Sequence, residues 1–286
     1  MIENESIMKL KSTINCRGKI IDLSEPKIMG ILNITPDSFY DGGKHTIENE
    51  AVKQVDKMLS EGADFIDIGA QSTRPNAPLL SPEDEIKRLT PILKAIKSTF
   101  TEVVLSVDTF QSKVARFVIE EFDVDVINDV SAGELDAEML PTIAHYNVPY
   151  IMMHMRGNPG IMQTLTNYND IVVDIIKYFA QKIEKTKLLG INDVLIDPGF
   201  GFSKTLEQNY ELLKRLKEFT IIGLPILVGL SRKSMIYKLL NKTPDQSLNA
   251  TSVLNAMALF HGANILRVHD VKEAKEVIQL MKMLAN

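Results

Sequence analysis

The sequence predicts an α/β fold in which eight parallel strands close into a barrel surrounded by helices, a (β/α)8 TIM barrel with an N-terminal β-hairpin. Eight short apolar runs each stop at a polar residue or a turn, and a helical pattern follows each of them. The length of 286 residues is usual for a single barrel of this kind, which needs about 250 residues. We therefore expect residues 1–286 to form one domain.

The first 25 residues are expected to form a hairpin ahead of the barrel. Residues 8–14 alternate between apolar and polar side chains, residues 15–18 supply a turn, and residues 19–23 form the returning strand. A hairpin in this position could close the bottom of the barrel, away from the chemistry.

Eight apolar runs predict the barrel strands: residues 28–32, 65–68, 103–107, 124–127, 150–153, 194–196, 226–228 and 264–266. In a closed parallel barrel all carboxyl-terminal strand ends gather around one mouth, where the chemistry takes place. The polar side chains expected at this mouth are Asn33, Asp108, Asn128, Asp197, Lys233, Arg267 and His269.

Helical patterns connect these runs, at residues 49–59, 81–96, 111–120, 137–145, 171–188, 206–217, 248–260 and 271–283. The second of them has a clear start, because Ser81 suits an N-cap and Pro82 the first helical position. The loops at 33–46 and 70–81 are longer than a connection requires, which makes them candidate lids. A third unusual loop, 154–169, is also expected to border the mouth.

The composition is that of a globular protein, with 45% apolar and 24% charged residues. A net charge of −5 with scattered basic residues gives no reason to expect a nucleic acid or a membrane as partner. The single cysteine, Cys16, excludes an internal disulfide and fits a reducing cytoplasm. We expect neither a signal peptide nor a membrane span, because the polar N-terminal residues 1–11 have no apolar core and no apolar stretch approaches the roughly 20 residues that cross a bilayer.

Eight strings at the strand ends carry a family resemblance: Gly30-Ile-Leu-Asn-Ile-Thr-Pro-Asp-Ser-Phe39 with Asp41-Gly-Gly43, Ser72-Thr-Arg-Pro75, Ser106-Val-Asp-Thr109, Ile127-Asn-Asp129, Met153-His-Met-Arg-Gly157 with Met162-Gln163, Asp197-Pro-Gly-Phe-Gly-Phe-Ser-Lys204, Leu230-Ser-Arg-Lys-Ser234 and Arg267-Val-His-Asp270. Each string alone is weak, but all eight occur in order at the ends of different strands. From residue 28 onward the chain resembles dihydropteroate synthase.

The resemblance implies a reaction of folate biosynthesis. A dihydropterin that carries a CH₂–diphosphate loses pyrophosphate, and the amine of p-aminobenzoate attacks the methylene carbon to give dihydropteroate. The sequence offers no Ser-His-Asp or Cys-His pair, which fits a dissociative displacement without a covalent enzyme intermediate. Asp108 is well placed to stabilise the positive charge that develops on the methylene, although an aspartate before Thr109 could also be a helix N-cap.

The pterin ring presents a 2-amino group next to a ring N–H, as guanine does, and one carboxylate can accept both hydrogens. The resemblance gives this role to Asp197, while Asn128 reads the remaining ring edge and Lys233 donates to the carbonyl and ring nitrogen. Met153 and Phe202 are expected to sandwich the ring, as two strand positions of the same parity that point into the barrel.

The diphosphate needs positive charge and hydrogen-bond donors. Arg267, Val268 and His269 lie at the end of the last strand, where barrels frequently bind phosphate. Asn33 can offer an amide oxygen to a Mg²⁺ that the diphosphate largely holds itself. Taken singly, Asn33 could be only a turn residue and His269 only a surface histidine.

The second substrate is a small aromatic carboxylate. Ser234 begins a helix whose amides and hydroxyl suit a carboxylate. The resemblance places Phe39, Thr73, Arg74 and Pro75 on the two lid loops, over the aminobenzoate ring and the pyrophosphate. Sulfonamide-insensitive relatives carry an extra aromatic-glycine insertion in the loop of Arg74 and Pro75, and the present sequence has none. We therefore expect sulfonamides to compete with p-aminobenzoate.

Two other readings remain at this point. A pterin-dependent methyltransferase would share the pterin readers but would not need the lid motif or the arginine and histidine of the last strand. A non-catalytic pterin-binding subunit would be expected to lack Lys233, Asp108 or Arg267. The resemblance also implies a homodimer formed by helices opposite the lids, for which the apolar helix at 248–260 is a candidate, although a buried core helix explains it equally.

Overall fold

The computed structural model describes residues 12–34, 44–71 and 79–285. Its centre is an eight-stranded parallel sheet with the order β8-β7-β6-β5-β4-β3-β10-β9. The bridge between Ile196 and Ile226 joins the two edges and closes the barrel. The predicted (β/α)8 barrel is thus confirmed, and its strands are β3 (Lys27–Asn33), β4 (Phe65–Gly69), β5 (Leu105–Asp108), β6 (Val126–Asp129), β7 (Tyr150–Met153), β8 (Val194–Asp197), β9 (Leu227–Val228) and β10 (Ile265–Val268).

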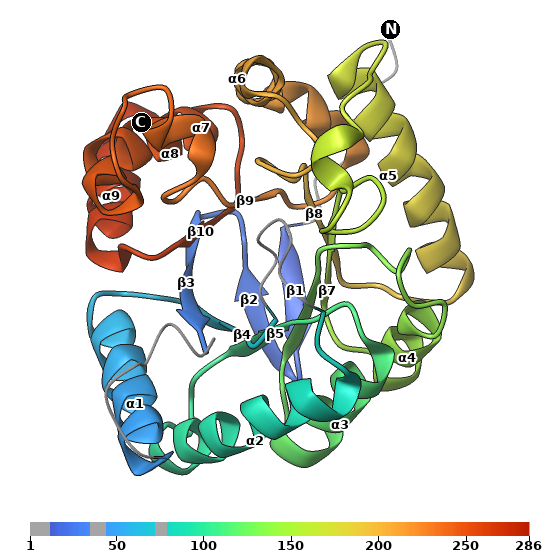
Figure 1. Ribbon diagram of the computed structural model, residues 1–286, viewed down its shortest axis with the longest axis vertical. Coiled ribbons are helices and arrows are strands. Elements are labelled where there is room, and N and C mark those ends of the chain that lie inside the picture. Colours follow the sequence, from blue (N-terminus) through green and yellow to red (C-terminus); the bar gives the residue numbers. More distant parts are fainter. Residues whose placement is uncertain (1–11, 35–43, 72–78, 286) are drawn as a thin grey trace, which may run out of the picture.

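Helices surround this barrel (Figure 1). They are α1 (Lys44–Ser60), α2 (Pro82–Thr99), α3 (Ser112–Phe122), α4 (Met139–Tyr146), α5 (Ile171–Leu188), α6 (Leu206–Lys214), α7 (Ser234–Tyr237), α8 (Leu248–Phe260) and α9 (Val271–Ala285), with 3₁₀ segments η2 (Met162–Thr164), η3 (Leu216–Ile222) and η4 (Pro244–Ser247). The predicted start of α2 is confirmed, because the Ser81 side chain accepts the N–H of Asp84 and Pro82 is the first helical residue.

The N-terminal hairpin is β1 (Thr13–Cys16) paired antiparallel with β2 (Lys19–Asp22). Arg17 and Gly18 turn the chain with φ values of 52° and 91°, the left-handed conformation that tight hairpins need. Side chains of this segment pack against a ring of apolar residues at the bottom of the barrel, in seven strands and just before β5: Met29, Phe65, Val104, Val126, Ile151, Leu195, Leu227 and Ile265. The hairpin therefore closes the bottom of the barrel, as predicted; residues 8–11 of the predicted first strand lie outside the described residues.

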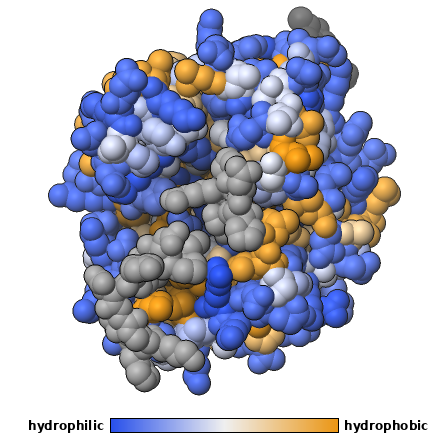
Figure 2. All heavy atoms as spheres, in the orientation of Figure 1, coloured by the Kyte–Doolittle hydropathy of each residue, from blue (hydrophilic) through white to orange (hydrophobic). Residues whose placement is uncertain are grey.

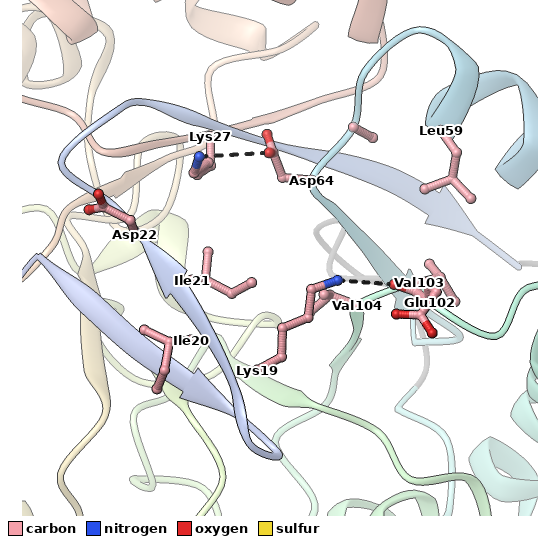
Figure 3. Close-up of a pocket in the computed structure, with 11 residues that line it drawn as sticks. Lys19, Ile20, Ile21, Asp22, Lys27, Leu59, Asp64, Glu102, Val103 and Val104 are labelled. Atoms are coloured by element: carbon pink, nitrogen blue, oxygen red, sulfur yellow. Dashed lines mark hydrogen bonds and ion pairs between the residues drawn. The ribbon is translucent and has the colours of Figure 1, made fainter.

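A surface pocket lies beside this hairpin (Figure 3). Lys27 at the start of β3 and Asp64 just before β4 form an ion pair of 4.0 Å on its wall, and Lys19 donates to the carbonyl of Glu102. These residues lie at the amino-terminal ends of the strands. The pocket is therefore at the opposite end of the barrel from the residues predicted to carry the chemistry.

The surface seen from the side of Figure 1 is mainly hydrophilic, with hydrophobic residues in small separate groups (Figure 2). In the described ranges, no helix combines the length and the apolar character that crossing a bilayer requires.

Candidate active site

One layer inside the barrel is polar although it lies directly above an apolar one. Side chains alternate along a strand, so the residues two positions after the apolar bottom layer also point inward. They include Asp67, Asn128, Met153, Asp197 and Arg267. Burying such groups costs free energy unless they are paired, and their presence where a core would be expected marks a functional centre.

Asp67 connects this polar layer across the barrel. Its Oδ2 accepts from Arg267 Nε at 2.6 Å and from Asn128 Nδ2 at 3.0 Å. A terminal nitrogen of Arg267 also donates to Asp108 Oδ2 at 3.0 Å. Four strands, β4, β5, β6 and β10, thus place one side chain each in a single network. The guanidinium holds two carboxylates, which fixes its plane.

Asp67 was not among the residues predicted for the site. It is fully buried, and its Oδ1 has no hydrogen-bond partner among the described residues. A signal was present in the sequence, since a carboxylate interrupts the apolar run of residues 65–68. Such an interruption inside a buried strand needs a partner, and Arg267 is that partner.

Asp108 has a carboxyl group whose proton affinity is unusual. Burial raises its pKa to about 7, although the neighbouring Arg267 favours the charged form and opposes the rise. Arg267 itself remains charged at any physiological pH. The charge of Asp108 therefore depends on pH within the physiological range.

Asp197 and Lys233 are two further ionisable groups at the mouth, and each influences the pKa of the other. Asp197 ends β8, its Oδ1 accepts the N–H of Gly199 at 2.7 Å, and burial raises its pKa while Lys233 opposes the rise. Burial lowers the pKa of Lys233 to about 8, with Asp197 opposing. The Lys233 amine donates to the carbonyl of Phe200 and lies 4.5 Å from the centre of the Phe202 ring.

Met153 and Phe202 belong to one apolar cluster at the mouth, together with Phe110, Val130, Met155 and Met162. Met153 is the last residue of β7, as predicted. Phe202, however, does not occupy a strand position, and the parity reasoning was wrong for it. Pro198 and Gly199 end β8 at Asp197, so Phe202 reaches the cluster from the following loop.

Arg267 and Val268 are the last two residues of β10, and His269 follows directly, so the segment lies at the end of the last strand as predicted. Ser231 Oγ lies 3.0 Å from His269 Nδ1 and accepts the backbone N–H of His269 at 3.2 Å. Burial, then the charge of Arg232 and of Arg267, lowers the pKa of His269 to about 4. This histidine is therefore neutral at pH 7 and can donate one N–H to an anion, so the cationic charge of the segment comes from Arg267.

Asn33 is the exposed last residue of β3 and pairs in register with Gly69, which in turn pairs with Asp108. A side chain added at Gly69 would stand 3.7 Å from Asn33 Oδ1 and 3.8 Å from Asp108 Oδ2. Oxygen atoms of the kind that Mg²⁺ prefers thus border one small space. Within the described residues, no three His, Cys, Asp or Glu side chains are grouped to hold a metal ion.

Of the residues predicted to contact p-aminobenzoate, the structure describes Ser234. Phe39, Thr73, Arg74 and Pro75 lie outside the described residues. Ser234 starts α7, as expected, but this helix is only 4 residues long.

The loop before α7 is held by Arg232, which the sequence analysis did not single out. Its φ is 56°, and its guanidinium bonds Asp270 at 2.6 Å and Asp245 at 3.0 Å. These contacts fix the segment that carries Lys233 and Ser234.

Comparison with known proteins agrees with this geometry. The family model described as "Pterin binding enzyme" matches residues 29–269. The dihydropteroate synthase of Escherichia coli K12 is 44% identical over 269 residues, which cover 93% of this chain and 94% of that protein.

The chain belongs to the dihydropteroate synthase family.

Solved structures of the family superpose closely. The Yersinia pestis dihydropteroate synthase, solved in a sulfonamide drug complex, has a TM-score of 0.89 at 41% identity, covering 96% of this chain and 99% of that one. The Xanthomonas albilineans dihydropteroate synthase, solved with 4-aminobenzoic acid, has a TM-score of 0.88 at 35% identity, covering 96% and 98%. The predicted family and fold are therefore confirmed.

Proposed function

We propose that this chain condenses (7,8-dihydropterin-6-yl)methyl diphosphate with p-aminobenzoate to give 7,8-dihydropteroate and pyrophosphate, in folate biosynthesis. The observation that carries the proposal is the convergence of Asp67, Asp108, Asn128 and Arg267 in one network at the same mouth as Asp197. A guanine-like ring edge and an anion are the two ligands that such a set of carboxylate, amide and guanidinium groups would recognise.

The pterin ring would lie on the polar layer inside the barrel. Asp197 accepts from the 2-amino group and the adjacent ring N–H, Asn128 contacts the remaining edge, and Lys233 donates to the ring carbonyl and nitrogen. The apolar cluster that contains Met153 and Phe202 supplies the faces of the ring. Each proposed contact fits its side chain, because a carboxylate accepts hydrogen bonds, an ammonium donates them and an amide does both.

The displacement needs no protein nucleophile. The bond between the methylene carbon and the diphosphate oxygen breaks, and the diphosphate leaves with that electron pair. The amine nitrogen of p-aminobenzoate forms the new C–N bond and loses a proton to water. The Asp108 carboxylate stabilises the positive charge on the methylene, and Arg267 and His269 bind the leaving diphosphate, with Val268 placing them on one strand end.

A Mg²⁺ ion fits the mouth through oxygen donors. Asn33 would offer its amide oxygen, with the substrate phosphates and water as further ligands, which is how Mg²⁺ is usually held. When bound, the ion neutralises negative charge on the diphosphate and makes it a better leaving group.

For p-aminobenzoate we propose contacts with Ser234 and with the lid residues Phe39, Thr73, Arg74 and Pro75, Thr73 also reaching the diphosphate. Sulfonamides would compete at this place, because a sulfonamide drug complex exists for the Y. pestis relative and the loop at 72–78 carries no inserted aromatic-glycine pair.

We further propose a homodimer, with residues 1–286 acting as one domain in the cytoplasm. The buried Cys16 of the hairpin suits a reducing compartment. Helices α8 and α9 pack side by side (Figure 1) and expose large apolar side chains: Val253, Met257, Phe260, Leu280, Met283 and Leu284. Such a patch suits a subunit interface, and light scattering of a Phe260→Asp variant would test it.

The decisive experiment mixes the purified chain with both substrates and follows pyrophosphate release. Release that requires p-aminobenzoate supports the synthase. Transfer of a methyl group from a methylated pterin without pyrophosphate would identify a methyltransferase, and ligand binding without turnover would indicate a non-catalytic subunit.

A further inference from the structure

Lys204 is a buried lysine near the mouth for which the proposed reaction has no use. Only 4% of its surface is exposed. Its amine donates to the carbonyl of Gly199 at 2.8 Å and to that of Phe202 at 2.9 Å, and it lies 3.1 Å from His154 Nδ1. The Lys204 amine thus connects two carbonyls of the loop at residues 198–204, which follows Asp197, and links this loop to the His154 side chain.

This loop has an unusual backbone that needs external support. Gly199, Gly201 and Ser203 have φ values of 75°, 81° and 53°, a conformation that costs free energy for any residue other than glycine. A side chain at Gly199 would stand 2.1 Å from the carbonyl oxygen of His154. The loop therefore runs tightly against the end of β7 and needs polar contacts to stay there.

Other bonds also hold this loop. Near Asp197, Lys233 donates to the carbonyl of Phe200, and the N–H of Phe202 donates to the carbonyl of Gly199 at 3.1 Å. Ser203 exchanges two hydrogen bonds with the backbone of Arg156, and Tyr168 donates to the carbonyl of Ser203 at 2.9 Å. Asn209 accepts the N–H of Gly201 at 2.7 Å. Near Asp197, the side chain that reaches the Gly199 and Phe202 carbonyls is Lys204.

The bridging role does not depend on the charge of the lysine. As an ammonium it can donate to both carbonyls and to His154 Nδ1; as a neutral amine it can still donate to both carbonyls and accept from a protonated Nδ1. Burial holds the pKa of Lys204 and that of His154 well below their usual values. Both forms tie Gly199 to Phe202.

We propose that Lys204 is a positioning residue for the pterin site: by joining the carbonyls of Gly199 and Phe202, it fixes Asp197 and the Phe202 ring in the orientation that binds the pterin. Asp197 is tied to the same loop because it accepts the N–H of Gly199. The inference rests on the proposed function, in which Asp197 and Phe202 contact the pterin ring.

The test compares Lys204→Met with Lys182→Met. Lys182 on α5 is a control of equal burial, since it is also 4% exposed and donates to a backbone carbonyl, that of Ala132 at 2.7 Å. This bond and its ion pair with Glu134 go to the loop after β6, and not to the 198–204 loop. Calorimetry gives the affinity for the dihydropterin diphosphate, steady-state kinetics gives KM for each substrate and kcat, and thermal unfolding reports stability.

Lys204→Met is expected to weaken pterin affinity at least about tenfold, to raise the pterin KM more than it lowers kcat, and to leave the aminobenzoate KM near that of the wild type. Lys182→Met should lose stability with unchanged pterin affinity. Equal pterin affinities in the two variants would overturn the proposal.

Lys204→Gln provides a second reading, because its amide keeps two N–H donors. The amide nitrogen lies one bond closer to the backbone than the lysine amine and should reach only one of the two carbonyls well, so the pterin affinity should lie between those of Lys204→Met and the wild type. If Lys204→Met does not fold, a folded Lys204→Gln with wild-type affinity overturns the proposal and a weakened one supports it. Failure of both variants to fold, with Lys182→Met folded, would mean a structural role only and also overturns it. A wild-type chain that binds no pterin would instead refute the proposed function.

Discussion

The replacement Asp197→Asn is expected to change the affinity for the pterin without lowering the stability of the fold. The carboxylate is 7% exposed, and burial disfavours its charged form. Asparagine keeps an oxygen for the N–H of Gly199, which now bonds Oδ1 at 2.7 Å, and removes a charge that is costly to bury. We therefore expect thermal stability to be unchanged or slightly higher.

The pterin should bind much more weakly to this variant. With Oδ1 engaged by Gly199, the new amide nitrogen would face the 2-amino group or ring N–H of the ligand, so one charge-assisted bond becomes a contact of two donors. Losing about 2–4 kcal/mol in this way corresponds to a loss of affinity of roughly 30- to 1000-fold.

Calorimetric titration with the dihydropterin diphosphate and thermal unfolding measure the two quantities. Asp129→Asn is the matched control: Asp129 is also a buried strand-end carboxylate, but it bonds Ser131, Gly133 and the Tyr150 hydroxyl. That variant should lose stability and keep its pterin affinity. An Asp197→Asn protein with a pterin affinity within about threefold of the wild type would refute the reasoning, because the change in binding free energy would then be well under about 1.4 kcal/mol.

Three further predictions concern the same mouth. Gly199→Ala should lower the melting temperature and the pterin affinity, because its side chain would meet the His154 carbonyl at 2.1 Å; unfolding and titration check this. Asp67→Asn should cost about 1–3 kcal/mol of unfolding free energy and reduce kcat/KM, since Arg267 loses its 2.6 Å carboxylate partner; an unchanged kcat/KM would contradict it. Asp108, with its pKa raised to about 7, is protonated below and charged above that value, so kcat/KM should fall as the pH is lowered through 7, and Asp108→Asn should abolish this pH dependence.

Much of the fold followed from the sequence because strand ends leave a clear pattern. The run at 150–153 and the helix at 248–260 have the bounds that were predicted. The helix expected at 49–59 instead starts at Lys44, because polar residues without a capping signal gave no sign of its first turn.

The site was only partly predictable for a different reason. Asn128 and Asp129 are adjacent and chemically similar, yet one joins the network inside the barrel and the other anchors a turn outside it. They differ only in the face of the strand on which they lie, because successive side chains of a strand point in opposite directions. Asp67 and the backbone course of the 198–204 loop depend on contacts between distant strands, which local patterns do not contain.

The hairpin at the bottom of the barrel has a consequence for the order of substrate binding and product release. In the described part of the chain, Ile14, Cys16 and Leu23 fill that end of the barrel, so ligands are expected to enter and leave at the opposite mouth. With the pterin bound as proposed, deepest in the barrel, we expect it to bind before p-aminobenzoate and the product to leave after pyrophosphate. Such an ordered mechanism would follow from a barrel that is closed at one end, whatever the relative affinities of the two substrates.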